Sequence, residues 1–148
     1  RQMCIRDSLY QIKETGKVKL FKSHKPDYQD GEQLRDFIYV KDVVAVIGWM
    51  LETMLDQKWQ PLHNGLYNLG TGEARSFIDL VRSTFAGLAL EPNIEFIDMP
   101  IDIRDTYQYF TEANMEKLKA AGYQTGFTSL EEGVQDYVVH YLQKGLIY

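Results

Sequence analysis

Polar and apolar residues follow helical and strand-like spacings in turn along this chain. Residues 9–15 have helical spacing, and Gly16 stands where a helix end in the left-handed conformation favours glycine. Residues 17–21 alternate polar and apolar side chains, which predicts a half-buried strand. A polar loop over 22–33 then leads to a segment at 34–40 with the composition of a second strand.

A long apolar helix is expected next. Asp42 is placed to cap its first turn, and apolar residues at helical spacing continue to about Gln57. Val44, Trp49 and Leu55 widen the apolar stripe. We therefore expect this helix to be covered on more than one side.

The second half of the chain continues the alternation. Residues 66–69 predict a short strand that runs into a glycine turn at 70–72, and residues 94–97 predict another strand. Between these strands, Ser76 is placed to cap a helix, with Asp79 in the position of its capping-box partner.

Two shorter helices complete the predicted order. After an extended segment at 107–110, Thr111 caps a short helix that Gly122 ends. Thr128 and Glu131 have the spacing of a capping box and open the last helix. Because the sequence contains no repeat and no internal linker, we expect one compact α/β unit.

The composition is that of a folded domain. The chain has 148 residues, of which 45% are hydrophobic and 25% charged, and this excludes a disordered or low-complexity segment. A net charge of −5 argues against a nucleic-acid partner, and no apolar run reaches the ~18 residues of a membrane span. Cys4 is the single cysteine, so no internal disulfide can form and a cytoplasmic protein is expected. The three histidines, His24, His63 and His140, lack metal-ligand spacing, so no metal site is predicted.

Residues 1–8 differ from the rest of the chain. They show neither clear periodicity nor the pattern of a signal peptide. We expect them to be a non-native leader, with residues 9–148 forming the domain itself. The alternative is that they are the ordinary start of the first helix.

Arg35 has the most informative placement among the charged residues. It stands where the 34–40 segment begins, and a planar guanidinium there can hold phosphate oxygens through two donors. The alternative is a surface arginine paired with a nearby carboxylate. Four lysines lie in the preceding strand and loop, at Lys17, Lys19, Lys22 and Lys25. Together they either suit a diphosphate ligand or form a solvated charged loop.

Two further features have both a binding and a structural interpretation. The glycine turn at 70–72 can cradle phosphate through its N–H groups, but it lacks the three-glycine dinucleotide fingerprint, so a tight connection is favoured. Tyr107, Tyr109 and Phe110 can stack on a nucleobase or pack in the core, and the core is favoured.

Several segments together resemble one enzyme family. Residues 35–43 (RDFIYVKDV) resemble a signature in the C-terminal part of the extended short-chain dehydrogenase/reductases, in their nucleotide-sugar epimerase and dehydratase group. Residues 67–72 (YNLGTG) resemble the second familiar segment of that group. Similarity to the members that act on an ADP-linked heptose extends further, over residues 20–24, 107–111, 118–123 and 131–134.

This resemblance implies a fold and a set of site residues. The chain would be the C-terminal, substrate-binding portion of an α/β extended short-chain dehydrogenase/reductase, lacking the N-terminal Rossmann half. The residues that match substrate-binding positions of the family are Phe21, Lys22, Ser23, His24, Arg35 and Tyr107. Other members often have an acidic residue and glycine in place of Lys22 and Ser23, which favours backbone contacts at these two positions.

The resemblance also implies an activity. It is the interconversion of two ADP-heptoses by oxidation and reduction at C6, dependent on NADP or alternatively NAD, in lipopolysaccharide biosynthesis. The family's Tyr-x-x-x-Lys pair and GxxGxxG turn do not occur in this sequence, so it names no catalytic or cofactor-binding residue. We therefore expect the chain alone to be inactive, and the full-length protein to be a homo-oligomer that binds an ADP-sugar.

Two other functions fit the same residues. A different member of the group would act on a UDP-, GDP- or dTDP-sugar. A non-catalytic nucleotide-sugar-binding module would never have carried a Rossmann half. If the Tyr-x-x-x-Lys pair and the GxxGxxG turn occur in frame upstream of residue 9, an enzyme is favoured over the binding module.

Overall fold

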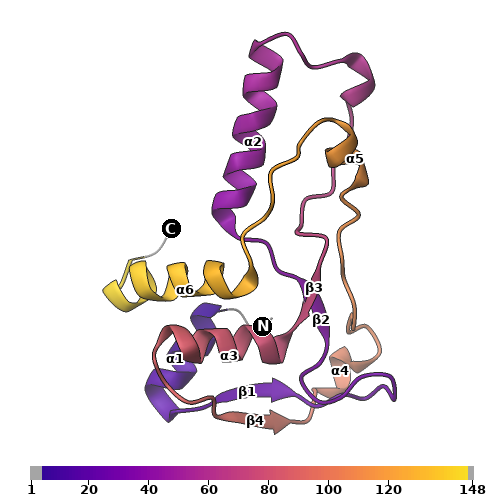
Figure 1. The fold of residues 1–148 in the computed structure, drawn as a ribbon. Coiled ribbons are helices and arrows are strands. Elements are labelled where there is room, and N and C mark those ends of the chain that lie inside the picture. Colours follow the sequence, from indigo (N-terminus) through magenta and orange to yellow (C-terminus); the bar gives the residue numbers. More distant parts are fainter. Residues whose placement is uncertain (1–4, 147–148) are drawn as a thin grey trace. The chain divides into compact units, whose positions relative to one another are not determined.

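The chain contains both helices and strands, as the predicted α/β class requires. The structure, a computed structural model, describes residues 5–146 (Figure 1). Its helices are α1 (Ile5–Thr15), α2 (Val40–Leu55), α3 (Phe77–Gly87), α4 (Ile101–Arg104), α5 (Glu116–Ala120) and α6 (Leu130–His140). Its strands are β1 (Val18–Phe21), β2 (Leu34–Asp36), β3 (Ala74–Ser76) and β4 (Ile94–Ile97). Short 3-10 helices span Pro61–His63 and Leu142–Lys144. The α/β class is confirmed.

The chain folds into two compact units, where the sequence predicted one. The first unit contains the described parts of Arg1–Arg35, Arg75–Thr111 and Ser129–Tyr148, and the second contains Asp36–Ala74 and Glu112–Thr128. The division falls within β2 and β3, which pair as a two-stranded sheet. Apolar periodicity indicates which side chains are buried, but it does not indicate that they belong to two separate cores. The prediction of one unit is therefore wrong.

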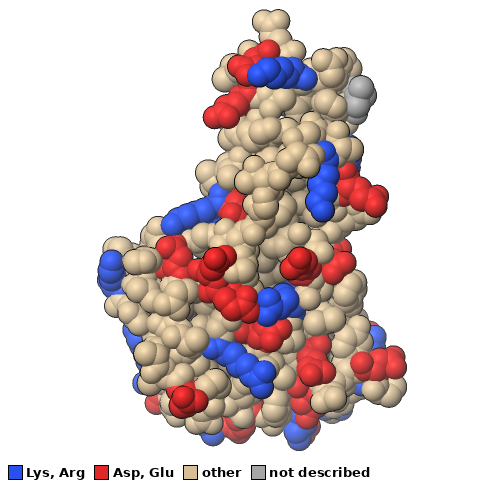
Figure 2. Space-filling view, viewed as in Figure 1, with Lys and Arg blue, Asp and Glu red and all other residues tan. Residues whose placement is uncertain are grey.

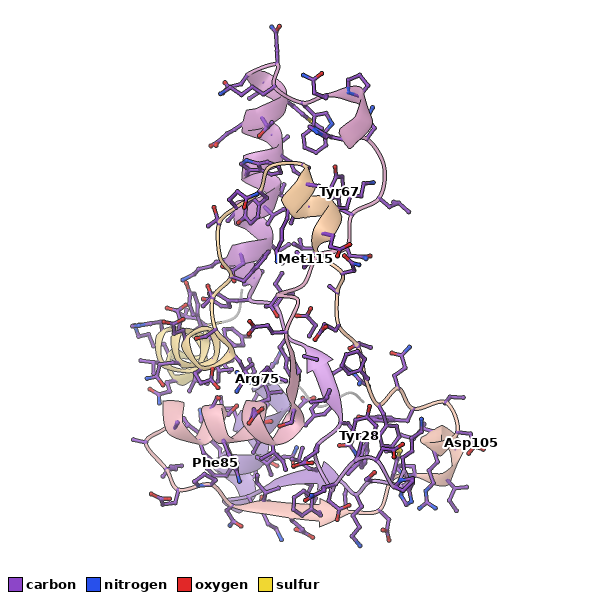
Figure 3. The ribbon with its side chains drawn as sticks, turned by 45° about the vertical axis from the view of Figure 1, so that its right-hand side comes forward. Tyr28, Tyr67, Arg75, Phe85, Asp105 and Met115 are labelled. Atoms are coloured by element: carbon purple, nitrogen blue, oxygen red, sulfur yellow. The ribbon has the colours of Figure 1, made fainter. Side chains whose placement is uncertain are left out.

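A parallel strand pair and three helices build the first unit. β1 and β4 pair in register from Val18 opposite Ile94 to Phe21 opposite Ile97. α1 and α3 pack on β1, and α6 packs on α3 (Figure 1). Phe85, which is 1% exposed, points from α3 toward β1 (Figure 3). Both strands of this pair were predicted from alternation, and both are confirmed.

Capping boxes begin α3 and α6, which pack together in this unit. The Ser76 hydroxyl accepts from the Asp79 N–H, and the Asp79 carboxylate accepts from the Ser76 N–H, as predicted. At α6 the same exchange joins Ser129 and Glu132. The prediction placed this cap at Thr128, one residue too early, because hydroxyl side chains at both positions fit the pattern.

α2 begins at Val40, before the predicted cap. Tyr39 occupies the N-cap position and makes no capping hydrogen bond through its side chain. Asp42 lies in the first turn instead, where its carboxylate accepts from the Thr128 N–H and hydroxyl, both at 2.8 Å. The negative charge still favours the start of the helix. The sequence thus predicted correctly that Asp42 lies at the start of this helix, but Asp42 does not take the predicted role of cap.

One apolar cluster forms the core of the second unit. Val46 of α2 packs with Met115, Leu118 and Tyr123, and each of the four is at most 5% exposed. Met115 lies beside α2 in Figure 3, and Trp49 packs against the cluster from the same helix. These contacts cover one side of α2.

The remaining apolar residues of α2 are exposed. Val44, Leu51 and Leu55 are 63%, 56% and 81% exposed. Among its residues, Val46 is the one that is fully buried. Within residues 5–146, cover on more than one side is therefore wrong, because the described chain packs a single cluster against this helix.

Local propensity predicted three other elements incorrectly. β2 ends at Asp36, so the expected second strand is much shorter than predicted. Residues 66–69 are not a strand in the described chain, because two of their side chains pack against the Val46 cluster instead. α5 begins after Met115, which takes the N-cap position predicted for Thr111.

α1 is longer at its start than the sequence predicted. It includes residues 5–8, and Ser8 is fully buried. Gly16 follows the helix with a φ of +72°, as expected. Residues 1–4, Cys4 among them, lie outside the described residues, so the proposed leader and the disulfide argument stay predictions. Over residues 5–146, no helix is both long and apolar enough to cross a membrane.

Candidate substrate-binding site

Tyr107 contacts two other predicted substrate-binding residues in the first unit, Arg35 and Phe21. The guanidinium carbon of Arg35 lies 5.4 Å from the centroid of the Tyr107 ring. The Phe21 ring meets the same ring edge to face, with 6.2 Å between centroids. The structure therefore brings together Phe21, Arg35 and Tyr107, although they are far apart in the sequence.

Backbone hydrogen bonds hold the segments that carry these side chains. The Leu34 N–H donates to the Tyr109 carbonyl at 2.8 Å, and the Thr111 N–H donates to the Leu34 carbonyl at 3.2 Å. The segment after α4 thus runs along β2. At the end of β1, the Phe21 carbonyl accepts from the Gly31 N–H at 3.1 Å. Gly31 has a φ of +75°, and a Cβ there would lie within 3.1 Å of three side chains, so only glycine fits.

Arg35 is buried, and its described partners are all uncharged. The side chain is 8% exposed, and its Nη1 donates to the Leu34 carbonyl at 2.7 Å. Its Nη2 donates to the Gln108 carbonyl, and its guanidinium also lies 5.7 Å from the Phe77 ring. Over residues 5–146 it forms no ion pair with a carboxylate. The alternative of an arginine paired with a nearby carboxylate therefore finds no support in its contacts.

A buried charge without a counter-ion favours binding of an opposite charge. Removing a cation from water costs free energy that carbonyl groups and aromatic faces offset only in part. A guanidinium has five N–H donors, and two of those of Arg35 reach carbonyl groups of the protein. The remaining donors are suited to an anion such as phosphate.

Tyr107 presents a neutral hydroxyl beside this cation. Burial raises the pKa of Tyr107, and Tyr109 adds to the rise, while the positive charge of Arg35 opposes it. The net shift is upward from the usual value of 10.0, so the hydroxyl keeps its proton at neutral pH. It can therefore donate a hydrogen bond to a ligand.

The other three predicted residues, at 22–24, are engaged differently. Lys22 pairs with Asp98, with 3.2 Å between Nζ and Oδ1. The Ser23 hydroxyl donates to the Lys25 carbonyl at 2.9 Å and accepts from the Lys25 N–H at 3.1 Å. The His24 side chain is exposed. The hydroxyl of Ser23 thus supports its own loop.

The N–H groups of this loop are also used within the protein. Those of Lys22 and Ser23 donate to the Ile97 carbonyl at 2.8 Å and to Asp30 Oδ1 at 2.7 Å. That of His24 donates to the Tyr109 hydroxyl at 2.8 Å. Contacts through these backbone donors, which the resemblance favoured, would therefore need the loop to rearrange. A ligand would reach the ring of Phe21 and the side chains of Lys22 and His24 without any change in the loop backbone.

The lysines around the loop are partly neutralised. Lys17 pairs with Glu95 and Lys22 with Asp98. Lys25 Nζ lies 4.7 Å from the centroid of the Tyr109 ring. On the face shown in Figure 2, acidic and basic side chains are intermixed. The lysines therefore contribute less positive potential than their number in the sequence indicated.

The aromatic residues after α4 divide between core and surface. Tyr109 is 4% exposed and packs edge to face with Tyr107, at 5.7 Å between centroids. Phe110 is 50% exposed. The favoured core interpretation holds for Tyr109 and not for Phe110.

The glycine turn in the second unit is occupied by a carboxylate that sequence analysis missed. Asp36 accepts from the Thr71 N–H and hydroxyl, both at 2.7 Å, and from the Gly72 and Ala113 N–H groups, both at 3.0 Å. A Cβ on Gly70 would lie 2.3 Å from Asp36 Oδ2. Spacing alone gave no signal for this contact, because the donors are far from Asp36 in the sequence.

These contacts decide whether the turn fits a dinucleotide cofactor. Its N–H groups at Thr71 and Gly72 already donate to Asp36, and the carboxylate fills the space next to Gly70. Burial raises the pKa of Asp36, but the hydrogen bonds from Thr71, Ala113 and Gly72 outweigh it and lower the pKa below 3.8. Because an ionised carboxylate already takes these donors, the turn does not fit the cofactor.

His63 and His140 each interact with a neighbour on their own segment. His63 Nδ1 accepts from the Gln60 N–H at 3.3 Å, and His140 lies 4.0 Å from Asp136 on an exposed part of α6. Across the described ranges, no group of three or more potential ligands could hold a metal ion.

The sequence of this chain is similar to those of known epimerases. The sequence model of the NAD dependent epimerase/dehydratase family matches residues 3–70. The ADP-L-glycero-D-manno-heptose-6-epimerase of Nitratidesulfovibrio vulgaris (strain DP4) is 51% identical over 132 residues, which are 89% of this chain and 39% of that protein. The family resemblance is confirmed. This chain thus spans 39% of the length of that epimerase.

Solved structures of epimerases share the fold. The crystal structure of the Helicobacter pylori ADP-L-glycero-D-manno-heptose-6-epimerase matches with a TM-score of 0.65 and 28% identity, over 92% of this chain and 36% of that one. A UDP-glucose-4-epimerase from Stenotrophomonas maltophila, solved with bound NAD, matches with a TM-score of 0.73 and 18% identity, over 98% of this chain and 40% of that one. The second likeness is one of fold alone. The chain thus has the fold of a part of these epimerases.

Proposed function

We propose that this chain is the substrate-binding part of an ADP-L-glycero-D-manno-heptose 6-epimerase. The reaction would interconvert ADP-D-glycero- and ADP-L-glycero-D-manno-heptose at C6, in lipopolysaccharide biosynthesis in the cytoplasm. A relative that carries this name is 51% identical over 89% of the chain, which supports the proposal.

Buried Arg35 is the observation that carries the proposal. It is 8% exposed, it has no carboxylate partner in the described chain, and it lies against Tyr107. A nucleoside diphosphate-sugar supplies the missing negative charge. The guanidinium would hold the diphosphate, and the Tyr107 hydroxyl would donate to the same ligand. Phe21 would pack against its less polar part.

The remaining predicted residues have supporting places in this proposal. Lys22 and His24 would contact the ligand from the edge of the site, since their side chains reach solvent. Ser23 would keep the loop in shape through its hydroxyl. The domain would extend over residues 9–148.

The cofactor and the catalytic groups would belong to a part of the protein beyond this chain. The glycine turn does not fit a dinucleotide, because Asp36 occupies its donors. NADP, or alternatively NAD, would bind there together with the Tyr and Lys of the family motif. The 148-residue chain alone would therefore have no epimerase activity. The full-length protein would be a homo-oligomer.

The test requires the chain joined to such a part. Residues 9–148 are produced behind either their own upstream reading frame or the N-terminal part of the Nitratidesulfovibrio vulgaris relative. Incubation with NADP and ADP-D-glycero-D-manno-heptose should form the L-glycero epimer, which chromatography separates. The isolated chain serves as the inactive control. Formation of the epimer by the isolated chain would contradict the division of roles.

Other nucleotide sugars distinguish the alternatives. Turnover of a UDP-, GDP- or dTDP-sugar in place of the ADP-heptose would identify a different member of the group. Binding of a nucleotide sugar without turnover by the joined protein would indicate the non-catalytic module. Either result would replace the proposed function.

A further inference from the structure

Tyr109 makes a hydrogen bond that has no part in the proposed function as described so far. Its ring is 4% exposed, and its hydroxyl accepts from the His24 N–H at 2.8 Å. The two residues lie far apart in the sequence, so the contact joins the loop after β1 to the segment after α4. A buried hydroxyl that binds a backbone N–H fixes that part of the chain in place.

The ring of Tyr109 is held from several sides. Tyr107 packs against it at 5.7 Å and Tyr28 at 5.1 Å between centroids, and Lys25 Nζ lies 4.7 Å above it. Its backbone carbonyl accepts from the Leu34 N–H. The hydroxyl therefore has a defined position from which to hold His24.

The loop at 22–24 is held through the N–H groups of three consecutive residues. Asp30 holds the Ser23 N–H at 2.7 Å, and strand pairing holds the Lys22 N–H at 2.8 Å. The bond from Tyr109 to His24 is the third along consecutive residues, and it is the one that connects directly to the Arg35 and Tyr107 cluster.

We infer that Tyr109 is a positioning residue for the nucleotide-sugar site. Its hydroxyl fixes the backbone of His24, and thereby sets where the side chains of Phe21, Lys22 and His24 stand relative to Arg35 and Tyr107. Because the ring is 4% exposed and packs within the protein, its part is to hold the loop rather than to contact the ligand. This role rests on the proposed function of the site, and it assigns a task to a residue outside the predicted substrate contacts.

Removal of one hydroxyl group tests the inference. Tyr109→Phe keeps the ring and its packing but frees the His24 N–H. Tyr28→Phe is the matched control, because Tyr28 packs on the same ring and its hydroxyl makes no hydrogen bond within the described chain. Both variants are made in the joined protein and compared with the unmodified one.

Three measurements separate positioning from simple stabilisation. In Tyr109→Phe the KM and the Kd for ADP-D-glycero-D-manno-heptose should rise by about three- to tenfold, as for the loss of one neutral hydrogen bond. The kcat should change less than about twofold, because the catalytic groups lie elsewhere. The His24 amide should exchange its hydrogen faster, and Tyr28→Phe should leave all three values unchanged.

The outcomes distinguish this inference from the proposed function. An unchanged Kd in Tyr109→Phe, with normal binding by the unmodified protein, would overturn the positioning role alone. If the unmodified protein instead binds UDP-glucose and not the ADP-heptose, and Tyr109→Phe weakens that binding, the proposed substrate is wrong and the positioning role stands. A lower melting temperature with an unchanged Kd would show a structural role only. Binding of neither sugar by the unmodified protein would overturn both.

Discussion

Arg35 and Asp36 are neighbours in the sequence with opposite charges, and the protein treats the two charges differently. Asp36 accepts four hydrogen bonds, from Thr71 twice and from Gly72 and Ala113 once each. Arg35 is 8% exposed, donates to two backbone carbonyls and has no carboxylate partner within the described chain. The fold compensates the charge of Asp36, whereas in the described chain it places no opposite charge beside Arg35.

This difference indicates how to separate a structural charge from a binding one. A carboxylate whose oxygens all have donors stabilises the fold, and its removal leaves those donors unpaired. A buried cation that meets only dipoles and rings gains most when an anion arrives. The number of a side chain's partners is therefore less informative than whether those partners neutralise its charge.

Loss of the Asp36 carboxylate should have the largest effect on stability. Asp36→Ala leaves three backbone N–H groups and a hydroxyl without their acceptor, and should lower the free energy of unfolding by about 3 kcal/mol. Asp36→Asn should cost about half as much, because one amide oxygen still accepts. Denaturant unfolding of the joined protein measures both. The exposed carboxylate Asp105, labelled in Figure 3, supplies the control Asp105→Asn, which should be neutral.

A loss of unfolding free energy in Asp105→Asn as large as that in Asp36→Asn would contradict the comparison between Asp36 and Arg35. So would an Asp36→Ala protein of normal stability, since the fold would then not depend on the compensated charge.

Loss of Arg35 should act on binding instead. Arg35→Ala should weaken ADP-heptose binding by about 2–4 kcal/mol, the scale for removing a buried, hydrogen-bonded charge partner. Arg35→Lys should recover part of this, because an ammonium offers a point charge without the planar fork. NADP affinity should be unchanged in both. Calorimetric titration and thermal melts, run side by side, measure the two properties.

The opposite pattern would identify Arg35 as structural. In that case the melting temperature falls while the affinity per folded molecule stays the same.

Acid should weaken the Asp36 contribution in a predictable window. The folded-state pKa of Asp36 is lowered from 3.8, so the ionised form is favoured in the folded protein. Its contribution is fully present above the unfolded pKa and is lost as pH falls through the lower folded one. The stability gap between the unmodified protein and Asp36→Asn should therefore be constant near neutral pH and narrow below about pH 4. Urea unfolding at a series of pH values tests this, and a gap that widens in acid would contradict it.

Arg75 should show the smallest effect and serves as the reference arginine. It pairs with Glu131 at 2.6 Å and with Asp79 at 3.2 Å, at 34% side-chain exposure. Partly exposed ion pairs contribute little, so Arg75→Ala should cost at most about 1 kcal/mol of stability. It should leave ADP-heptose affinity unchanged in the same titration. A binding defect as large as that of Arg35→Ala would remove the distinction between the two arginines.

Elements with local causes were predictable from the sequence. The alternation of residues 17–21 and 94–97 gave both strands of the parallel pair, and the Ser76 cap follows from two side chains three positions apart. The boundaries that failed depend on distant contacts. The Asp42 carboxylate accepts a hydrogen bond from the Thr128 N–H. The residue spacing around Asp42 or Thr128 does not predict this bond.

For the candidate site, the sequence could name residues but not their physical surroundings. Family resemblance named Arg35 and Tyr107, and the structure places the two side chains together. Sequence could not show that Arg35 has no carboxylate partner among the described residues, or that Asp36 fills the glycine turn, because both depend on which segments meet in space. For the same reason Tyr109 had no signal beyond its aromatic ring.

Ionic strength acts unequally on the charges around Tyr107. Lys22 and its partner Asp98 have side chains that are 44% and 69% exposed, so dissolved salt screens them over about 8 Å at 0.15 M. Arg35 is 8% exposed and is screened far less. Polyanions that meet only the surface lysines would be displaced by salt, whereas a small diphosphate that reaches the buried guanidinium would stay bound. The depth of one arginine would thus make the proposed site selective for size as well as for charge.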